Sequence, residues 1–360
     1  MTGSESKAPP GVVEGLRREI EASGPMPFDR FMEASLYGPG GYFQSPVVRS
    51  QRDGDFLTSP EVSPAFGGTL AKAVSAERAR VGEPFTVVEV GAGTGSLLQP
   101  LLAELEVPPS RVVVVEVSPG ARGSLRARLP GVEVSESFED VRYGVRGVVV
   151  ANELLDNLPA ALVVKRGSGW RERAVVINGT GLAWAEIEPR REVVAWADAH
   201  GGCVPDGGQV EVQLEAGRWL AGVLERLTAG AVIIIDYGDT AEGLESRRPD
   251  GTMRTYRHHH LGPDPLLDPG STDVTMDVNF TALASIAMEC GAETELWRQD
   301  EYLARWGLLD HIADLKRHEF EASASGETMA RLRWRDLVTG AETLLHPRGL
   351  GDFRVLVARM

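Results

Sequence analysis

Residues 86–98 read TVVEVGAGTGSLL, a hydrophobic strand that runs into a glycine-rich turn and then into the start of a helix. Gly91, Gly93 and Gly95 permit a tight turn and let a ligand approach bare backbone. Thr94 or Ser96 can cap the helix that follows. A strand, a glycine turn and a helix N-terminus in this order are typical of a cofactor-binding loop. The sequence therefore predicts an α/β fold with a cofactor at this turn.

Two acidic residues make this prediction more specific. Glu89 stands two places before the first glycine, and a G-x-G-x-x-G dinucleotide pattern would need glycine in place of Ser96. A second strand, expected over residues 111–117, ends near Glu116, where a carboxylate can bond ribose hydroxyls in a doubly wound sheet. A plain tight turn and an NAD-binding loop remain alternatives to this interpretation.

The composition is that of an ordinary globular protein. The chain has 360 residues, of which 42% are hydrophobic and 25% charged, so it can bury one large core or two smaller ones. A net charge of -15 argues against nucleic acid as the main partner. Cys203 and Cys290 lie far apart, which argues against a disulfide framework or a cysteine metal site. Without a long apolar run or an apolar leader, we expect no membrane partner and a cytoplasmic location.

Polar side chains follow the hydrophobic strand expected near residues 147–151. They include Asn152, Glu153 and Asp156, at the end of the strand where open α/β sheets bind ligands. If this segment turns helically, the two carboxylates share a face and can hold a guanidinium. The alternative is an ordinary helix start, with Asn152 as the cap and Glu153 complementing the helix dipole.

The next buried strand, expected over residues 231–237, ends in Asp236 and Tyr237. Asp236 can face a substrate at the same edge of the sheet, or it can bond a neighbouring loop. The run His258-His259-His260 has no matched set of ligands around it, and adjacent side chains point in different directions, so we expect no metal site.

The chain pattern indicates one elaborated domain. We expect an N-terminal helical extension over residues 1–54 and a catalytic domain over residues 55–360, with insertions at about 160–205 and 240–278. Hairpin-like strands are expected in the first insertion. The second is rich in Gly, Pro, Asp and His and is expected to be a long functional loop.

A set of short motifs spans nearly the whole chain. They are YGPGGYF at 37–43, GDFLTSPE at 54–61, EVGAGTG at 89–95, NELLDNLP at 152–159, DYG at 236–238, GTMR at 251–254, His259, PG at 269–270, DVT at 273–275, VNF at 278–280 and GLGDF at 349–353. Together these motifs resemble those of the MidA-like methyltransferases, a family of class I enzymes that use S-adenosylmethionine (S-adenosyl-L-methionine). Met276 and Asn279 depart from the pattern, because His and Asp are more usual there.

The resemblance implies a doubly wound, Rossmann-like methyltransferase sheet and a set of site residues. It assigns the cofactor site to Thr58, Ser59, Pro60, Glu61, Glu89, Gly91, Gly93, Gly95 and Glu116. Asn152, Glu153 and Asp156 would line the reaction side, and Asp236, Tyr237 and His259 would contact the substrate.

The family link also predicts the reaction. We expect a protein arginine N-methyltransferase that acts on a protein with an exposed arginine, with a connection to the assembly of respiratory NADH dehydrogenase. The rival interpretations are a small-molecule methyltransferase and an S-adenosylmethionine-binding assembly chaperone with little turnover. A homodimer is compatible with all three, and the sequence does not fix the oligomeric state.

Overall fold

The computed structural model describes residues 10–44, 58–257 and 260–360. Its centre is a seven-stranded sheet in the order β16-β17-β10-β5-β2-β3-β4. The strands are β2 (Thr86–Val90), β3 (Arg111–Val115), β4 (Glu133–Ser135), β5 (Val145–Asn152), β10 (Leu227–Asp236), β16 (Glu293–Arg298) and β17 (Arg354–Arg359). The expected doubly wound sheet is thus confirmed.

The direction of the strands decides where ligands can bind. Strands β4, β3, β2, β5 and β10 are parallel, and β17 is antiparallel to both β10 and β16. From β2 the chain first builds outward through β3 and β4, and then it returns to place β5 on the other side of β2. This reversal leaves a crevice at the carboxyl ends of β2 and β5, which is the usual binding place in such sheets.

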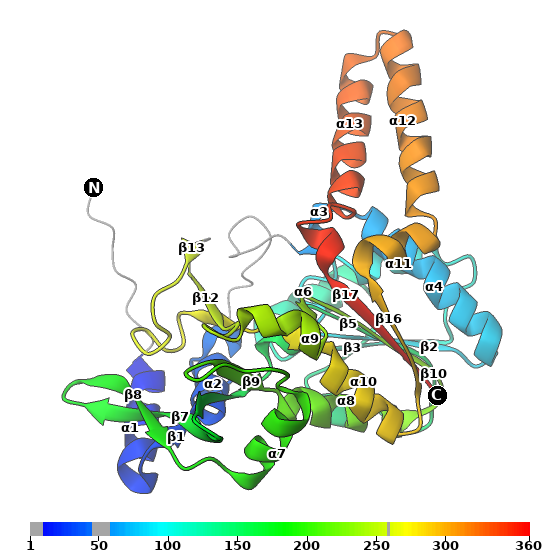
Figure 1. Cartoon of the computed structure of the whole chain (residues 1–360). Helices are drawn as coiled ribbons and strands as arrows, with labels where there is room; N and C mark the ends of the chain where they lie inside the picture. The colour runs from blue at the N-terminus through cyan, green and yellow to red at the C-terminus, as the bar shows by residue number, and fades with distance from the viewer. Residues whose placement is uncertain (1–9, 45–57, 258–259) are drawn as a thin grey trace.

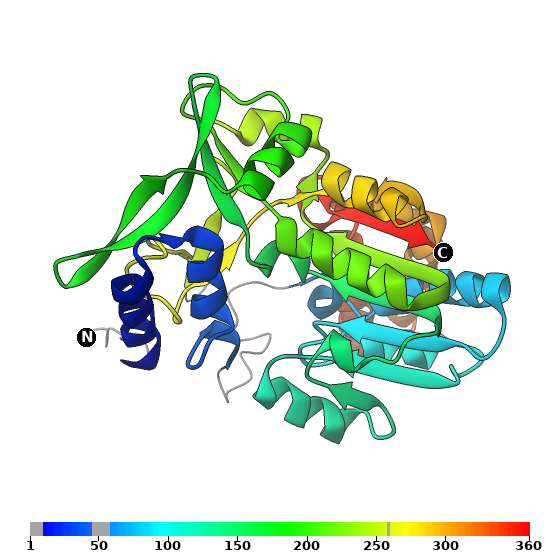
Figure 2. The same ribbon diagram turned by 90° about the horizontal axis from the view of Figure 1, so that it is seen from below.

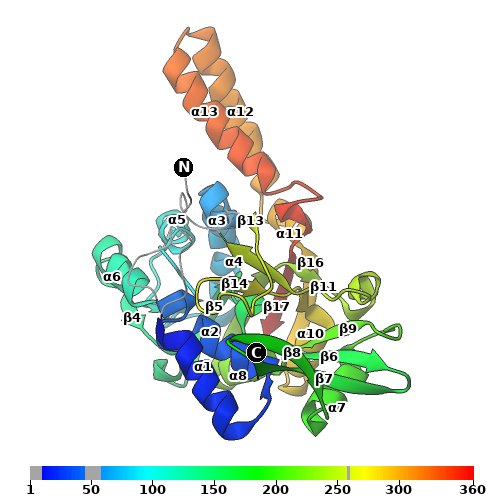
Figure 3. The ribbon, with the colours of Figure 1, turned by 90° about the vertical axis from the view of Figure 1, so that its left-hand side faces the viewer.

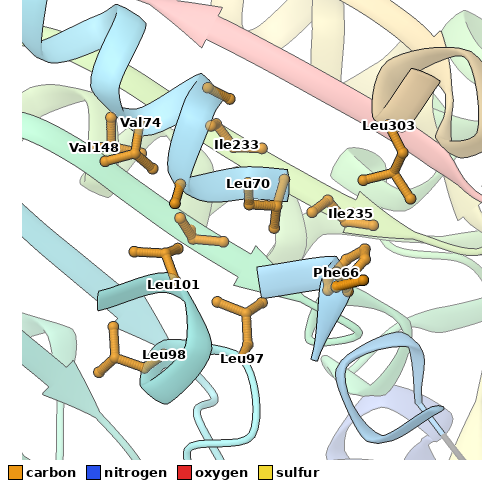
Figure 4. Close-up of a cluster of buried hydrophobic side chains, with 14 of the residues drawn as sticks. Phe66, Leu70, Val74, Leu97, Leu98, Leu101, Val148, Ile233, Ile235 and Leu303 are labelled. Atoms are coloured by element: carbon orange, nitrogen blue, oxygen red, sulfur yellow. The ribbon is translucent and has the colours of Figure 1, made fainter. Parts of the chain in front are cut away.

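Both faces of the sheet are covered, which explains why its central strands are continuous hydrophobic runs. One face packs against α4 (Ala65–Val81), α5 (Leu98–Glu104) and α11 (Gln299–Arg305). Figure 4 shows this core, in which Phe66, Leu70 and Val74 of α4 lie over Val148 and Ile233 of the strands. The other face packs against α8 (Leu214–Arg226) and α10 (Phe280–Glu289), as Figure 1 shows.

A second, antiparallel sheet lies beside the first (Figure 2). It consists of β1 (Met26–Pro27), β6 (Ala161–Arg166), β7 (Gly169–Asn178), β8 (Gly181–Ile187) and β9 (Gln209–Val212). Helices α1 (Pro10–Ser23) and α2 (Phe28–Leu36) pack on one side of it, and α7 (Arg191–His200) packs on the other. Because β1 pairs with β7, the described N-terminal residues share a sheet with the segment after β5.

The segment expected to be a long loop after residue 240 contains regular structure, which corrects that expectation. It holds α9 (Ala241–Leu244), the 3-10 turn η4 (Glu245–Arg247), and a small sheet of β12 (Arg254–Arg257), β13 (His260–Leu261) and β14 (Asp273–Thr275). Nearby, β11 (Gly238–Asp239) pairs with β15 (Val278–Asn279). Strands of two to four residues are too short to show a hydrophobic period.

A helical hairpin projects from the body of the molecule (Figures 1 and 3). It consists of α12 (Leu308–Ala324) and α13 (Thr328–Thr343). Ile312 and Leu315 of α12 are buried together with Val338 and Ala341 of α13. Within the described residues, no helix is long and apolar enough to cross a membrane.

Candidate active site

A cavity of about 1040 Å³ opens at the carboxyl ends of β2, β3, β5 and β10. Its wall draws on segments that are far apart in sequence, from the residues after α2 to the turn η5 (Leu350–Asp352). The lining includes the aromatic residues Tyr37, Tyr42, Phe43, Trp219, Tyr237, Tyr256 and Phe353. The cavity is large enough for a cofactor together with a substrate side chain.

The glycine turn forms one side of this cavity. Gly91, Gly93 and Gly95 have φ angles of 74°, 51° and 79°, a region that favours glycine. A Cβ atom on Gly91 would lie 3.0 Å from Leu154, whereas one on Gly93 would meet no atom of the described residues within 4 Å. Gly93 lines the cavity, so a side chain there would occupy ligand space.

Glu116 directly follows β3 and joins two loops at the cavity wall. Its Oε2 accepts the backbone N–H of Gly93 (2.8 Å), and its Oε1 accepts the backbone N–H of Ser118 (2.7 Å). Burial raises the pKa of this carboxyl above its ordinary value, against the effect of these hydrogen bonds. Glu116 is therefore fixed where it can meet a ligand on the glycine turn.

Glu89 is a buried acid with an unused acceptor. The side chain is 4% exposed, and its Oε2 has no hydrogen-bond partner in the part of the chain that the structure describes. Burial, and then the charge of Glu116, raise its pKa to about 8. Glu89 does not line the cavity, whose wall at this point is formed by Val90 and Gly91. An acceptor of this kind suits a donor group such as the ammonium of S-adenosylmethionine.

Glu153 lies at the end of β5 in a strained conformation. Its φ is 49°, a left-handed value that residues other than glycine seldom adopt. Its Oε1 accepts the side-chain N–H of Asn152 (3.2 Å) and the backbone N–H of Ser59 (3.3 Å). Burial, and then the charge of Asp156, raise the pKa of Glu153 to about 8. The ordinary helix start, which was the alternative for this segment, does not form.

Asp156 lies in the following 3-10 turn, η3 (Leu155–Asn157), and also lines the cavity. The hydroxyl of Tyr237 donates to its Oδ2. Its Oδ1 is buried and has no hydrogen-bond partner among the described residues. Burial raises the pKa of Asp156 to about 6, in spite of the bond from Tyr237. The two carboxylates thus reach one cavity without sharing a regular helix.

Asp236 holds the loop instead of facing the cavity, which corrects its assignment as a substrate contact. The side chain is fully buried and is not part of the cavity wall. Its Oδ2 accepts the backbone N–H groups of Leu155 (2.9 Å) and Asp156 (3.3 Å), and its Oδ1 accepts that of Tyr237 (3.0 Å). A carboxylate that binds three N–H groups fixes both of these loops at once.

Only part of the predicted cofactor segment TSPE, residues 58–61, lines the cavity. Thr58 and Glu61 line the cavity, and the backbone N–H of Thr58 donates to Oε2 of Glu61 (3.2 Å). Ser59 and Pro60 are buried in α3 (Ser59–Val62) and do not line it. Asn152 also lies outside the wall, with its Oδ1 buried and unbonded within the described ranges.

His259 lies outside the described residues, so its predicted substrate contact stays a prediction. Across residues 10–44, 58–257 and 260–360, no group of three or more His, Cys, Asp or Glu side chains is placed to hold a metal ion.

The two departures from the family pattern have structural roles. Met276 is buried, and its backbone N–H donates to the carbonyl of Asp156 (3.0 Å). Asn279 caps α10 by accepting the N–H of Ala282 (3.1 Å), and its side-chain N–H donates to the carbonyl of His200 (2.8 Å). Neither side chain lines the cavity.

Sequence reasoning missed a basic cluster in the wall. Arg247 and Arg254 both form ion pairs with Asp277 there. Arg254 ends the GTMR motif, which was the one available signal for it. Asp277 lies 30 and 23 residues away from the two arginines, so no local spacing connects them.

Curated relatives cover most of the chain. The protein is 30% identical over 326 residues to "Protein arginine methyltransferase NDUFAF7 homolog, mitochondrial" of Drosophila melanogaster, which covers 79% of this chain and 72% of that protein. It is 27% identical to the human "Protein arginine methyltransferase NDUFAF7, mitochondrial", with 95% and 81% covered. These names contradict the expected cytoplasmic location, which was wrong: they point to mitochondria.

The fold and the family are shown by two further matches. A crystal structure from Burkholderia thailandensis, bound to S-adenosyl-homocysteine, superimposes with a TM-score of 0.85 and 29% identity over 97% of this chain and 92% of that one. Residues 69–297 match the family described as "Putative S-adenosyl-L-methionine-dependent methyltransferase". The chain belongs to this family of S-adenosylmethionine-dependent methyltransferases.

Proposed function

We propose that the protein transfers a methyl group from S-adenosylmethionine to a guanidinium nitrogen of an arginine in a protein substrate. The observation that carries this proposal is the pair of buried carboxylates, Glu153 and Asp156, in the wall of one cavity beside the glycine turn. The relatives named as protein arginine methyltransferases support the same substrate.

The cofactor residues fit S-adenosylmethionine, which supplies an electrophilic methyl group when bound. Glu116 would bond the ribose hydroxyls, and Gly93 leaves space beside it. Glu89 lies behind Val90 and Gly91 and would hold the methionyl ammonium through water, because its Oε2 lacks a partner within the described part of the chain. Thr58 and Glu61 would close over the ligand from α3.

The carboxylates would orient the guanidinium. A buried acid with a raised pKa is poorly solvated, so it gains more from a cation than an exposed acid does. Asp156 has an unbonded Oδ1 among the described residues, and Tyr237 fixes its other oxygen. An arginine would thus be held by charge-assisted hydrogen bonds with one nitrogen towards the methyl group.

The test separates binding from transfer. Glu153→Gln and Asp156→Asn keep the shape of each side chain but remove its ability to ionise opposite a guanidinium, so both variants should bind S-adenosylmethionine as the wild type does. Transfer of labelled methyl to cell-extract protein should fall about 100-fold, since the guanidinium is no longer oriented. Glu188→Gln, on an exposed residue paired with Arg171, is the matched control.

The molecule that carries the labelled methyl group decides between the three proposed functions. Mass spectrometry should find the label on arginine. Label on small molecules would favour the small-molecule methyltransferase, and cofactor binding without turnover would favour the assembly chaperone. The link to NADH dehydrogenase assembly stays a prediction from the family resemblance.

A further inference from the structure

The cavity wall contains two guanidinium groups that share one carboxylate. Arg247 ends η4, Arg254 begins β12, and Asp277 lies between β14 and β15. Nη1 of Arg254 is 2.9 Å from Oδ1 of Asp277, and Nη1 of Arg247 bonds Oδ2 of the same residue. All three residues line the cavity.

The shared carboxylate is held firmly in place. The side chain of Asp277 is only 2% exposed. Its backbone N–H donates to Oγ1 of Thr252 (3.2 Å), and its carbonyl accepts the side-chain N–H of Gln213 (3.3 Å). Asp277 therefore acts as a fixed anchor for both guanidiniums.

The two guanidiniums retain unused donors. Their side chains are 35% and 41% exposed, and each shows a single hydrogen bond within the described residues, the one to Asp277. A guanidinium offers five N–H donors in a planar fork that matches a carboxylate. The three side chains together carry one net positive charge, in a cavity whose wall also includes Asp156 and Asp273.

Arg247 and Arg254 form the basic wall of the cavity. This basic wall adjoins the part of the cavity that is lined by Asp156. Arg254 of β12 pairs with Thr275 of β14, and the next residue, Met276, donates its backbone N–H to the carbonyl of Asp156 (3.0 Å), so the two regions are neighbours. The glycine turn and Glu116 belong to other segments, after β2 and β3. A bound substrate would thus meet carboxylates and guanidiniums at neighbouring places.

We propose that Arg247 and Arg254 form a carboxylate-binding subsite, which holds an Asp or Glu side chain close to the target arginine of the substrate. This inference rests on the proposed function. The carboxylates at Glu153 and Asp156 take the cationic target, and the two arginines take the acidic neighbour. The enzyme would accordingly prefer arginines that lie near an acidic residue.

The experiment uses short Gly/Ser peptides that contain one arginine and one Glu, Gln or Lys at varied distance from it. The full-length wild type should methylate the best Glu peptide with a kcat/KM about tenfold above that of its Gln counterpart, since one charge-assisted pair is gained. In Arg254→Gln the Glu-to-Gln ratio should fall towards about one. Arg254→Lys keeps the charge but loses the fork, so its ratio should lie between the two.

Two further measurements keep the result unambiguous. Arg171→Gln removes an exposed arginine paired with Glu188 outside the cavity, and it should keep the wild-type ratio. Thermal unfolding checks that each variant is folded. Arg247→Gln should lower the Glu-to-Gln ratio of kcat/KM as Arg254→Gln does. The methionyl carboxylate of the cofactor is the other source of this chemistry, so affinity for S-adenosyl-homocysteine is measured in every variant.

The outcomes are distinct. Equal wild-type rates for Glu and Gln peptides would overturn the subsite, as would a folded Arg254→Gln protein that loses S-adenosyl-homocysteine affinity and keeps the peptide ratio. Peptide binding with S-adenosyl-homocysteine present is measured by fluorescence anisotropy. A Glu preference in binding without arginine methylation would support the subsite and contradict the proposed function, while peptides that neither bind nor react would contradict both.

Discussion

Asp236 accepts the backbone N–H of Leu155 at 2.9 Å, a bond that ties the end of β10 to the loop after β5. The two residues are 81 positions apart in the chain. Through this bond, and those to Asp156 and Tyr237, one buried carboxylate sets the position of two loops that line the cavity. The geometry of the site thus depends on a residue that does not line it.

Asp236→Asn should weaken methyl transfer more than it weakens cofactor binding. The amide would turn an N–H group towards backbone N–H donors, which costs about 1 to 3 kcal/mol of unfolding free energy. Urea unfolding and transfer kinetics measure the two effects. Asp206→Asn is the matched control, because Asp206 accepts a backbone N–H from Gly167 (2.8 Å) in an exposed turn. Equal losses in both variants would show that Asp236 has no special positioning role.

Glu116→Ala should reduce affinity for S-adenosylmethionine by about 1.5 to 3 kcal/mol, since charge-assisted bonds to the ribose would be lost. Titration calorimetry measures this change. The variant also frees the N–H groups of Gly93 and Ser118, so thermal unfolding should be recorded beside it. A folded variant with wild-type affinity would remove Glu116 from the cofactor site.

Gly93→Val should abolish cofactor binding while the sheet remains folded. The substitution strains a residue whose φ is 51° and fills space in the cavity. Gly179→Val is the control for strain alone, because Gly179 has a φ of 59° in the turn between β7 and β8. Calorimetry on both variants checks this, and retained binding in Gly93→Val would place the cofactor elsewhere.

Glu153→Gln should make the stability of the ligand-free protein less dependent on pH. The pKa of Glu153 is raised from 4.5 to about 8 in the folded state, so the native state binds more protons than the unfolded chain between these values. Wild-type stability should therefore fall as pH rises through this window, by at most about 1.4 kcal/mol per pH unit from this group. The Gln variant lacks this titrating group. Its free energy of unfolding, measured relative to that of the wild type, should therefore rise with pH.

Urea unfolding of both proteins across the window measures this difference. Other buried acids contribute in the same direction, including Glu89 and Asp236, so only the difference between the two proteins reports on Glu153. A difference that does not change with pH would mean that Glu153 titrates normally.

Local sequence was enough to predict the central sheet and the glycine turn at the end of β2. The strand at 86–90, the three glycines and Glu116 each carry their signal within a few residues. The left-handed φ of Glu153 could not be predicted, because it depends on packing and on the bond from Ser59, 94 residues away. Likewise, nothing near Asp236 decides between a substrate and a loop as its partner, since that depends on how β5 and β10 pair.

The basic wall illustrates a related difficulty. Arg254 was visible as part of a motif, but its partner Asp277 lies across a small sheet whose strands are too short to leave a pattern. Composition indicated only an acidic protein, and the meeting of two arginines on one aspartate in the cavity wall depends on the fold.

The projecting hairpin of α12 and α13 has a consequence for hydrogen exchange. Its base joins the main core through Leu308 and Ala341, whereas Phe320 and Met329 near the tip are 74% and 68% exposed. The outer turns can therefore open in a local unfolding event that leaves the sheet intact. Their amide protons should exchange long before those of β5 and β10, at a rate set by helix fraying and not by global stability.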